Sequence, residues 1–145
     1  MLNRIIIILC LILVGCDNGD IMGPQSSYDF QIEIENNYLD ENGYYHIQLN
    51  PNSQTLQKIT GHTNNPNIQK VYWNCDTMLE MEYQGQLVLV PIINNSSYTN
   101  DDGDAFVMLG PHPEMAGDTI TVIGGYTDNF NNIDYESYIF IVLNF

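Results

Sequence analysis

Acidic side chains cluster in two turn-rich stretches of this 145-residue sequence. One cluster is Asp101, Asp102 and Asp104, and the other is Asp128 and Asp134, which flank several asparagines. Calcium binds six to eight oxygen atoms, mostly from loop carboxylates and carbonyls. These five aspartates are therefore the candidate calcium ligands. The spacing differs from that of an EF-hand loop, and Asp, Asn and Gly also serve ordinary turns.

The position of the connecting loops decides whether these acids can meet. Counting strands that run alternately up and down places the loops at 76–77, 94–104 and 126–134 at one end of the domain. We therefore expect Asp76 to lie beside the two acidic clusters.

Other residues with catalytic potential do not form an enzyme motif. The sequence has no H-E-x-x-H pattern and no G-x-S-x-G turn. The remaining candidates are three histidines and two carboxylate pairs: His46, His62 and His112, and Glu33 with Glu35 and Glu80 with Glu82. A catalytic carboxylate pair needs one member in a water-poor pocket. These glutamates fall on the polar sides of alternating strands, which favours a solvated surface. We expect no enzyme, unless a pocket places a histidine beside an acid.

The elements that position these residues are short strands. Alternation of apolar and polar residues predicts strands over 28–35, 44–49, 56–62, 71–75, 79–83, 87–93, 105–109, 119–123 and 138–145. Gln84-Gly85 predicts a tight hairpin. The segment 87–93 is apolar on both faces, which is typical of a central strand, and Gly124-Gly125 is expected to bend or end its strand. The sequence contains no amphipathic helix.

Several tyrosines are candidates for ligand contact. By the alternation, polar faces or loops carry Tyr44, Tyr72, Tyr98, Tyr126 and Tyr135. Exposed aromatic rings stack on sugars or anchor protein interfaces. Sheets also favour tyrosine for packing alone.

Trp73 lies in a mid-chain strand that follows the strand of Ile59 and precedes a short hairpin. This placement resembles the core tryptophan of immunoglobulin-like sandwiches. The resemblance implies an antiparallel β-sandwich of about seven to nine strands over residues 28–145. The disulfide of that family is missing, because Cys75 is the one cysteine in this range, and we expect it to be a buried thiol.

The N-terminus contains a targeting signal. Arg4 precedes an apolar run, 5–14, which as a helix spans about 15 Å, half of a bilayer core. Leu13-Val14-Gly15-Cys16 then resembles the lipobox of bacterial lipoproteins. The resemblance implies removal of residues 1–15, acylation of Cys16, and a tether over 16–27. Asp17 resembles the inner-membrane retention signal of enterobacterial lipoproteins, a rule that other bacterial groups do not follow reliably. Both the outer membrane and the periplasmic face of the inner membrane are therefore expected locations.

Charge limits the partners. Beyond residue 15, Lys58 and Lys70 are the only strong bases against 18 acidic residues. Nucleic acids are excluded, since they bind through basic phosphate contacts. Anionic lipid headgroups are unfavourable for the same reason.

These observations predict a lipid-anchored protein of the bacterial cell envelope. We expect a non-catalytic binding or assembly module, with an envelope protein or a glycan as partner, that uses loops at one end of its sandwich. The alternative is a small closed β-barrel that carries an apolar ligand, as lipocalin-like lipoproteins do.

Overall fold

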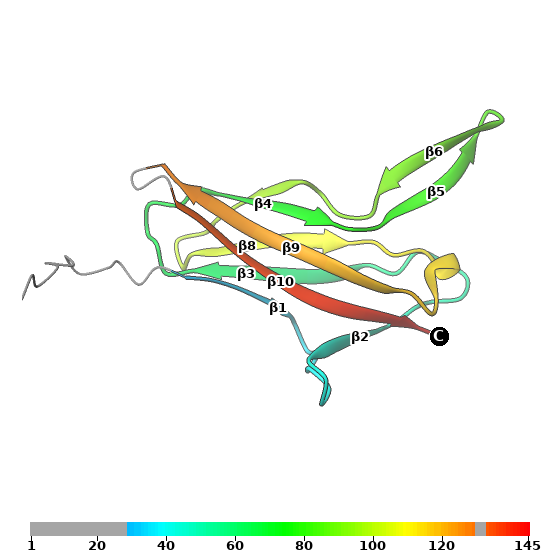
Figure 1. Cartoon of the computed structure of the whole chain (residues 1–145), viewed down its shortest axis with the longest axis horizontal. Helices are drawn as coiled ribbons and strands as arrows, with labels where there is room; N and C mark the ends of the chain where they lie inside the picture. The colour runs from blue at the N-terminus through cyan, green and yellow to red at the C-terminus, as the bar shows by residue number, and fades with distance from the viewer. Residues whose placement is uncertain (1–28, 130–132) are drawn as a thin grey trace, which may run out of the picture.

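The computed structural model describes residues 29–129 and 133–145, which form two β-sheets packed face to face and a separate two-stranded hairpin (Figure 1). The predicted signal peptide, Cys16 and the tether up to residue 27 lie outside the described residues. Within the described part, no helix has the length and apolarity needed to cross a bilayer. The single helical turn there is the 3-10 helix η1 (Pro113–Met115).

The first sheet has three antiparallel strands. In order across the sheet they are β1 (Phe30–Ile34), β3 (Gln57–Thr63) and β8 (Asp104–Leu109). Every second residue of β1 is buried, because Phe30, Ile32 and Ile34 all point to one face of the strand. This alternation was predicted from the sequence and is confirmed.

The second sheet has five strands. In order they are β2 (Tyr44–Gln48), β10 (Ile133–Asn144), β9 (Thr119–Asp128), β4 (Lys70–Cys75) and β7 (Ser96–Tyr98). Neighbours are antiparallel except β2, which runs parallel to β10 with Tyr44 opposite Phe140. In this order β3, β4, β9 and β10 occupy the places of strands B, C, F and G of the immunoglobulin fold. The predicted immunoglobulin-like sandwich is confirmed, with ten strands among the described residues and one parallel pair.

The core lies between these sheets. Five large aliphatic side chains from both sheets are fully buried: Ile59, Leu109, Ile120, Ile141 and Leu143. Cys75 is also buried, as predicted, and burial raises the pKa of its thiol above the ordinary value. The core thus draws on strands from Phe30 to Leu143, the whole length of the domain.

Trp73 lies between the two sheets, in the part of the core that contains Phe30. It is 4% exposed, its ring meets the Phe30 ring edge-on at 6.1 Å, and its Nε1 donates to Ser97 Oγ at 2.8 Å. A Cβ on Gly124 would lie 2.7 Å from the ring of Trp73. β9 therefore continues straight through Gly124-Gly125, where the sequence predicted a bend or an end, because the missing side chain makes room for the indole.

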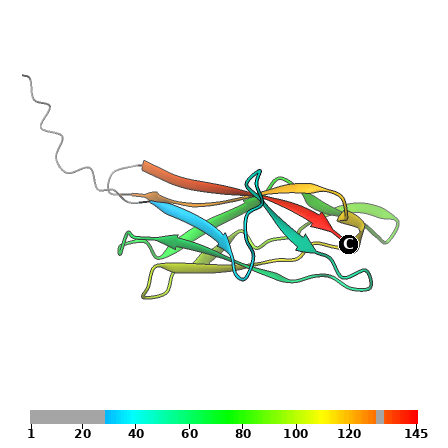
Figure 2. The ribbon, with the colours of Figure 1, turned by 90° about the horizontal axis from the view of Figure 1, so that it is seen from below.

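The remaining two strands form a hairpin of their own. β5 (Met78–Tyr83) pairs only with β6 (Gln86–Pro91), and Figures 1 and 2 show this pair projecting beyond one end of the sandwich. Its turn has φ of 52° at Gln84 and 77° at Gly85, as the predicted tight hairpin requires. The expected central strand over 87–93 is wrong: only Ile92 and Ile93 of this stretch are buried, because β6 pairs with β5 alone among the described strands and projects beyond the sandwich (Figure 1).

Two further boundaries differ from the prediction. The polar stretch 94–103 contains the short strand β7, which pairs with the start of β4. β9 and β10 extend toward each other as far as Asp128 and Ile133. Both differences arise because pairing with a neighbouring strand, and not apolar alternation, holds these residues extended.

Candidate functional site

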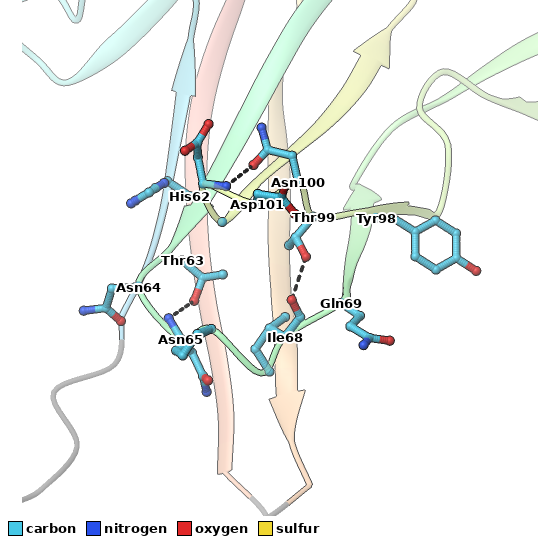
Figure 3. A pocket seen from close by; sticks show the side chains of 13 residues that line it. His62, Thr63, Asn64, Asn65, Ile68, Gln69, Tyr98, Thr99, Asn100 and Asp101 are labelled. Carbon is cyan, nitrogen blue, oxygen red and sulfur yellow. Dashed lines mark hydrogen bonds between the residues drawn. The ribbon is translucent and has the colours of Figure 1, made fainter.

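A polar hollow of about 620 Å³ opens at the end of the sandwich where β1 begins. It lies between the β3–β4 connection and the β7–β8 turn (Figure 3). Its lining includes two of the predicted calcium ligands, Asp101 and Asp102, and the exposed Tyr98. The described chain also starts here, since the Asp29 amide donates to Asn64 Oδ1 at 3.1 Å.

The polar groups around this hollow are engaged with the loops that carry them. Asn100 Oδ1 accepts from the amides of Asp102 and Asp104, and Thr99 Oγ1 donates to the Ile68 carbonyl at 2.6 Å (Figure 3). Asn65 Oδ1 likewise accepts from the Asn67 amide. Such side-chain to backbone bonds are what builds asparagine-rich turns. They explain much of the polar composition of this end of the molecule.

The candidate calcium ligands form two separate groups. Asp101 and Asp102 lie in the β7–β8 turn with Asp104 at the start of β8, whereas Asp128 ends β9 and Asp134 lies near the start of β10. Asp104 Oδ1 lies 2.7 Å from His62 Nδ1, and Asp134 Oδ1 accepts from Thr127 Oγ1 at 2.7 Å. Asp128 is buried at the end of β9. Among the described residues, no three acidic, histidine or cysteine side chains gather as a metal site would require. The calcium site stays a prediction.

Asp76 lies at the opposite end of the sandwich, contrary to expectation. Its Oδ1 accepts from the Thr121 amide at 2.9 Å, near the start of β9, whereas the 126–134 loop follows the end of β9. The unforeseen strand β7 adds one pass across the sheet and moves the 94–104 loop away from Asp76. Burial acts to raise the pKa of Asp76, but hydrogen bonds from Thr121 and Thr77 outweigh it and lower the pKa.

One histidine does stand beside an acid at the hollow, the arrangement that would favour an enzyme. The His62 side chain is 52% exposed, however, and Asp104 is 29% exposed. Of the two threonine hydroxyls in the lining, Thr63 Oγ1 accepts from the Asn65 amide and Thr99 Oγ1 donates to the Ile68 carbonyl. Neither is oriented by His62 as a nucleophile would be.

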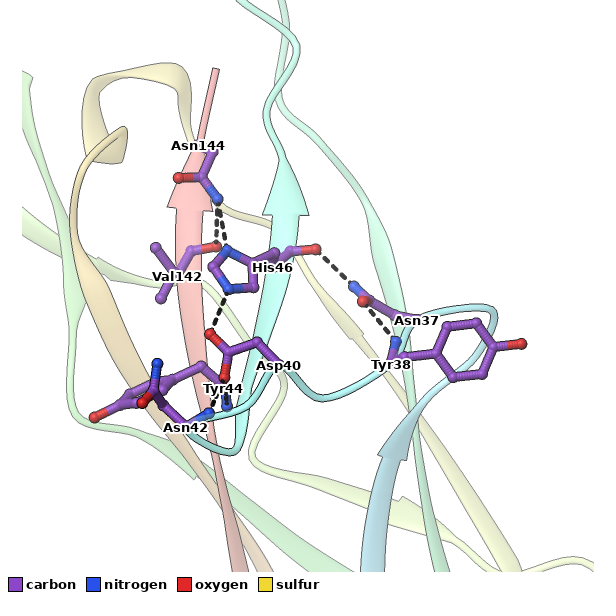
Figure 4. Close-up of polar contacts among 8 residues, drawn as sticks. All are labelled: Asn37, Tyr38, Asp40, Asn42, Tyr44, His46, Val142 and Asn144. Carbon is purple, nitrogen blue, oxygen red and sulfur yellow. Dashed lines mark hydrogen bonds and ion pairs between the residues drawn. The ribbon is translucent and has the colours of Figure 1, made fainter.

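His46 belongs to a structural network at the β2–β10 edge (Figure 4). Its Nε2 lies 3.0 Å from Asp40 Oδ2, and its Nδ1 lies 3.1 Å from Asn144 Nδ2. Because an amide nitrogen can only donate, the neutral ring accepts at Nδ1 and donates from Nε2 to Asp40. This bond, with those from the Tyr44 and Asn42 amides, lowers the pKa of Asp40 to about 2. The network fastens the turn before β2.

The predicted surface tyrosines differ in exposure. Tyr72 and Tyr98 are exposed as expected, and Tyr44 and Tyr135 are half-buried. Tyr126 is 3% exposed and stacks on Tyr135 at 5.0 Å, so its assignment to a polar face is wrong. The continuation of β9 through its glycines places Tyr126 on the inner face, where burial raises the pKa of its hydroxyl.

The β5–β6 hairpin is the surface that the sequence analysis missed. Cross-strand pairing places Met81 opposite Val88 and Leu79 opposite Val90 on one face, which is therefore apolar. The other face pairs Glu80 with Leu89 and Glu82 with Leu87. Leu87 is 69% exposed and Leu89 is 59% exposed. The sequence signal was the alternation of β5, which separates an apolar face from an acidic one.

Such a hairpin is unusual for a protein surface. Complete burial of one aliphatic side chain stabilises a protein by about 1.5–3 kcal/mol, and several such side chains here are largely in water. A two-stranded hairpin is marginally stable alone, and both of its outer edges present unpaired backbone groups. Contiguous exposed apolar surface of this kind marks interaction sites.

Comparisons with known proteins assign this chain to no family. No protein-family model matches the sequence, and no curated protein is significantly similar to it. A solved structure, the FixG-related protein from Vibrio parahaemolyticus, aligns over 81% of this chain and 97% of its own with 10% identity and a TM-score of 0.41.

Proposed function

We propose that this chain is a lipid-anchored protein of the bacterial cell envelope, held through Cys16, whose sandwich is a non-catalytic binding or assembly module. Its contact surface is the β5–β6 hairpin. The observation that carries this proposal is the exposure of apolar side chains on a hairpin that pairs with no other strand among the described residues.

The positions of the two ends support an anchored module. Asp29 lies at the hollow end of the sandwich and the hairpin projects from the other end (Figures 1 and 2). A chain that reaches the membrane through residues 16–28 therefore directs the hairpin away from its point of attachment. A partner in the envelope or beyond it can then reach the hairpin without passing the sandwich.

The alternative of a carrier for an apolar ligand has less support. A barrel needs an interior lined by one face of nearly every strand. Here the space between the sheets is filled by fully buried side chains such as Ile59, Ile120 and Leu143. The hollow of about 620 Å³ at the end of the sandwich is polar and lies outside this core.

Site-specific photo-crosslinking in the native host tests the binding surface. A photoreactive amino acid replaces Leu89 on the hairpin or, as the matched control, Leu39, which is 56% exposed on the β1–β2 connection. We expect a discrete adduct with another protein from position 89 and none from position 39. Equal labelling from both positions, or none, would overturn the proposal.

Lipid attachment is tested in the same cells. Labelled palmitate is expected to enter the wild-type chain and not the Cys16→Ser chain, which should leave the membrane fraction. Retention of the variant in the membrane would contradict anchoring through Cys16.

A further inference from the structure

The free edge of β5 has a regular chemical pattern. Along this strand the apolar residues Leu79, Met81 and Tyr83 alternate with the acids Glu80 and Glu82. All of them except Leu79 are exposed. Alternate residues of a strand point to opposite faces. An added strand would thus meet apolar side chains on one face and carboxylates on the other.

We propose that β5 accepts an extended strand of a partner protein in which apolar and basic residues alternate. This inference rests on the proposed function, since it names the chemistry of the partner at the same hairpin. The apolar residues of the added strand would lie beside Met81 and its neighbours, and its lysines or arginines beside Glu80 and Glu82. Strand addition of this kind takes affinity from the backbone and specificity from alternate side chains.

The backbone of β5 is open to such pairing. In the described part of the chain, its sheet contains only β5 and β6, so one side of β5 has no strand beside it. The outer edge of β6 is a poorer acceptor, because it ends in Pro91, which lacks an amide donor. β6 also carries no charge with which to select a partner.

The charges of the chain favour a basic partner. Lys58 lies 3.4 Å from Glu35 and over the Phe106 ring, and Lys70 lies over the Tyr72 ring. Both lysines thus belong to the sandwich, and no ion pair found in the described residues involves Glu80 or Glu82.

Charge also disfavours two other occupants of the edge. A second copy paired along β5 would place acids against acids, which destabilises cross-strand pairs. An anionic membrane surface would be repelled in the same way.

Peptide binding to the full chain, held in nanodiscs of neutral phosphatidylcholine, tests the proposal. The probe is a labelled heptapeptide of alternating valine and lysine. Its control has the same composition in block order, four valines and then three lysines. Fluorescence anisotropy should give about three- to tenfold tighter binding for the alternating peptide, because only it offers a lysine beside each glutamate and valines on the apolar face.

Two paired variants separate specific pairing from general attraction to an acidic protein. E80Q/E82Q should remove the preference for the alternating peptide. E33Q/E41Q, which removes the same charge from exposed positions of the sandwich, should retain it. The charge reversal E80K/E82K should transfer the preference to a peptide of alternating valine and glutamate.

Three results would overturn the proposal. They are equal binding of the two lysine peptides, equal loss in the two glutamine variants, and concentration-dependent self-association of the wild-type chain that the E80K/E82K change leaves intact. Crosslinking from position 89 in cells distinguishes failure of the strand-addition proposal from failure of the proposed contact surface. If that adduct persists while the peptide preference fails, only the strand chemistry is wrong.

Discussion

Two hairpins of this molecule, β9–β10 and β5–β6, contradict the simplest expectation about apolar strands. β9 contains two adjacent glycines and three threonines, yet Ile120, Val122 and Tyr126 on it are buried. β6 reads Leu-Val-Leu-Val and every residue in it is exposed. The difference is that β9 faces the three-stranded sheet across the core, whereas β6, in the described part of the chain, has only β5 beside it and lies outside the sandwich.

The comparison separates apolarity from burial. Glycine stabilises little by itself, but at Gly124 it admits the ring of Trp73 and so contributes to the core. The aliphatic residues of β6 contribute little to the fold and keep their apolar surface available. Residue type therefore indicates what a strand can bury, and the arrangement of the sheets decides whether it does so within this chain or against a partner.

The largest loss of stability is expected from a substitution in the β9–β10 hairpin. Ile141 in β10 is fully buried, so Ile141→Ala removes buried methylene groups and leaves a cavity. We expect the free energy of unfolding to fall by about 2–5 kcal/mol. Urea denaturation followed by circular dichroism measures this change. A loss below about 1 kcal/mol would mean that the two sheets pack loosely at this position.

Gly124→Ala, which adds a methyl group to the core, is expected to lower the free energy of unfolding by less than Ile141→Ala. In Gly124→Ala the new methyl group would meet the Trp73 ring, so the indole or β9 has to move. We expect a destabilisation of about 1–3 kcal/mol. Trp73 is the only tryptophan, so its fluorescence reports directly on the site. Wild-type emission should be blue-shifted and poorly quenched by acrylamide, and the variant should be quenched more easily. Unchanged quenching would contradict the contact.

The matched substitution in the β5–β6 hairpin should hardly change the free energy of unfolding. Leu89 is 59% exposed, so Leu89→Ala is expected to alter the free energy of unfolding by less than about 0.5 kcal/mol. The urea titration used for Ile141→Ala provides the measurement. A loss as large as that of Ile141→Ala would show that the hairpin is packed in solution, and the comparison would fail.

The smallest effect is a pH dependence at the β2–β10 edge. The folded pKa of Asp40 is about 2, against an ordinary value of 3.8, chiefly because His46 donates to the carboxylate. A lowered folded pKa stabilises the protein above pH 3.8, and this contribution disappears as the pH falls toward 2. Acid titration of stability should therefore be shallower between these values in Asp40→Asn. An identical slope would exclude Asp40 as a source of acid sensitivity.

The sequence was sufficient for those elements that local rules govern. Alternation identified β1, Gln84-Gly85 identified a hairpin turn, and Trp73 was placed correctly in the core. Long-range pairing was beyond these rules. The strand β7 has only three residues, two of them serines, and it is held by β4 and by the bond from the Trp73 amide to the Asn95 carbonyl.

The candidate site was missed for the same physical reason. A two-sided apolar strand is the pattern of both a buried central strand and an exposed binding strand. Only the position of the opposing sheet, set by residues far along the chain, distinguishes them. Asp101 and Asp102 were located correctly in a turn, whereas Asp104, Asp128 and Asp134 lie in the strands β8, β9 and β10. The sequence could not show this, because the lengths of these strands depend on how β8 pairs with β3 and β9 with β10.

The direction of β1 has a mechanical consequence. This strand starts at the end of the sandwich opposite the hairpin and runs toward the hairpin, antiparallel to β3 over five residue pairs (Figure 1). A pulling force between residue 29 and the hairpin acts along β1, so the hydrogen bonds between β1 and β3 are sheared together and not opened one after another. The first strand to bear a load is therefore held in the orientation in which a β-sheet resists extension best.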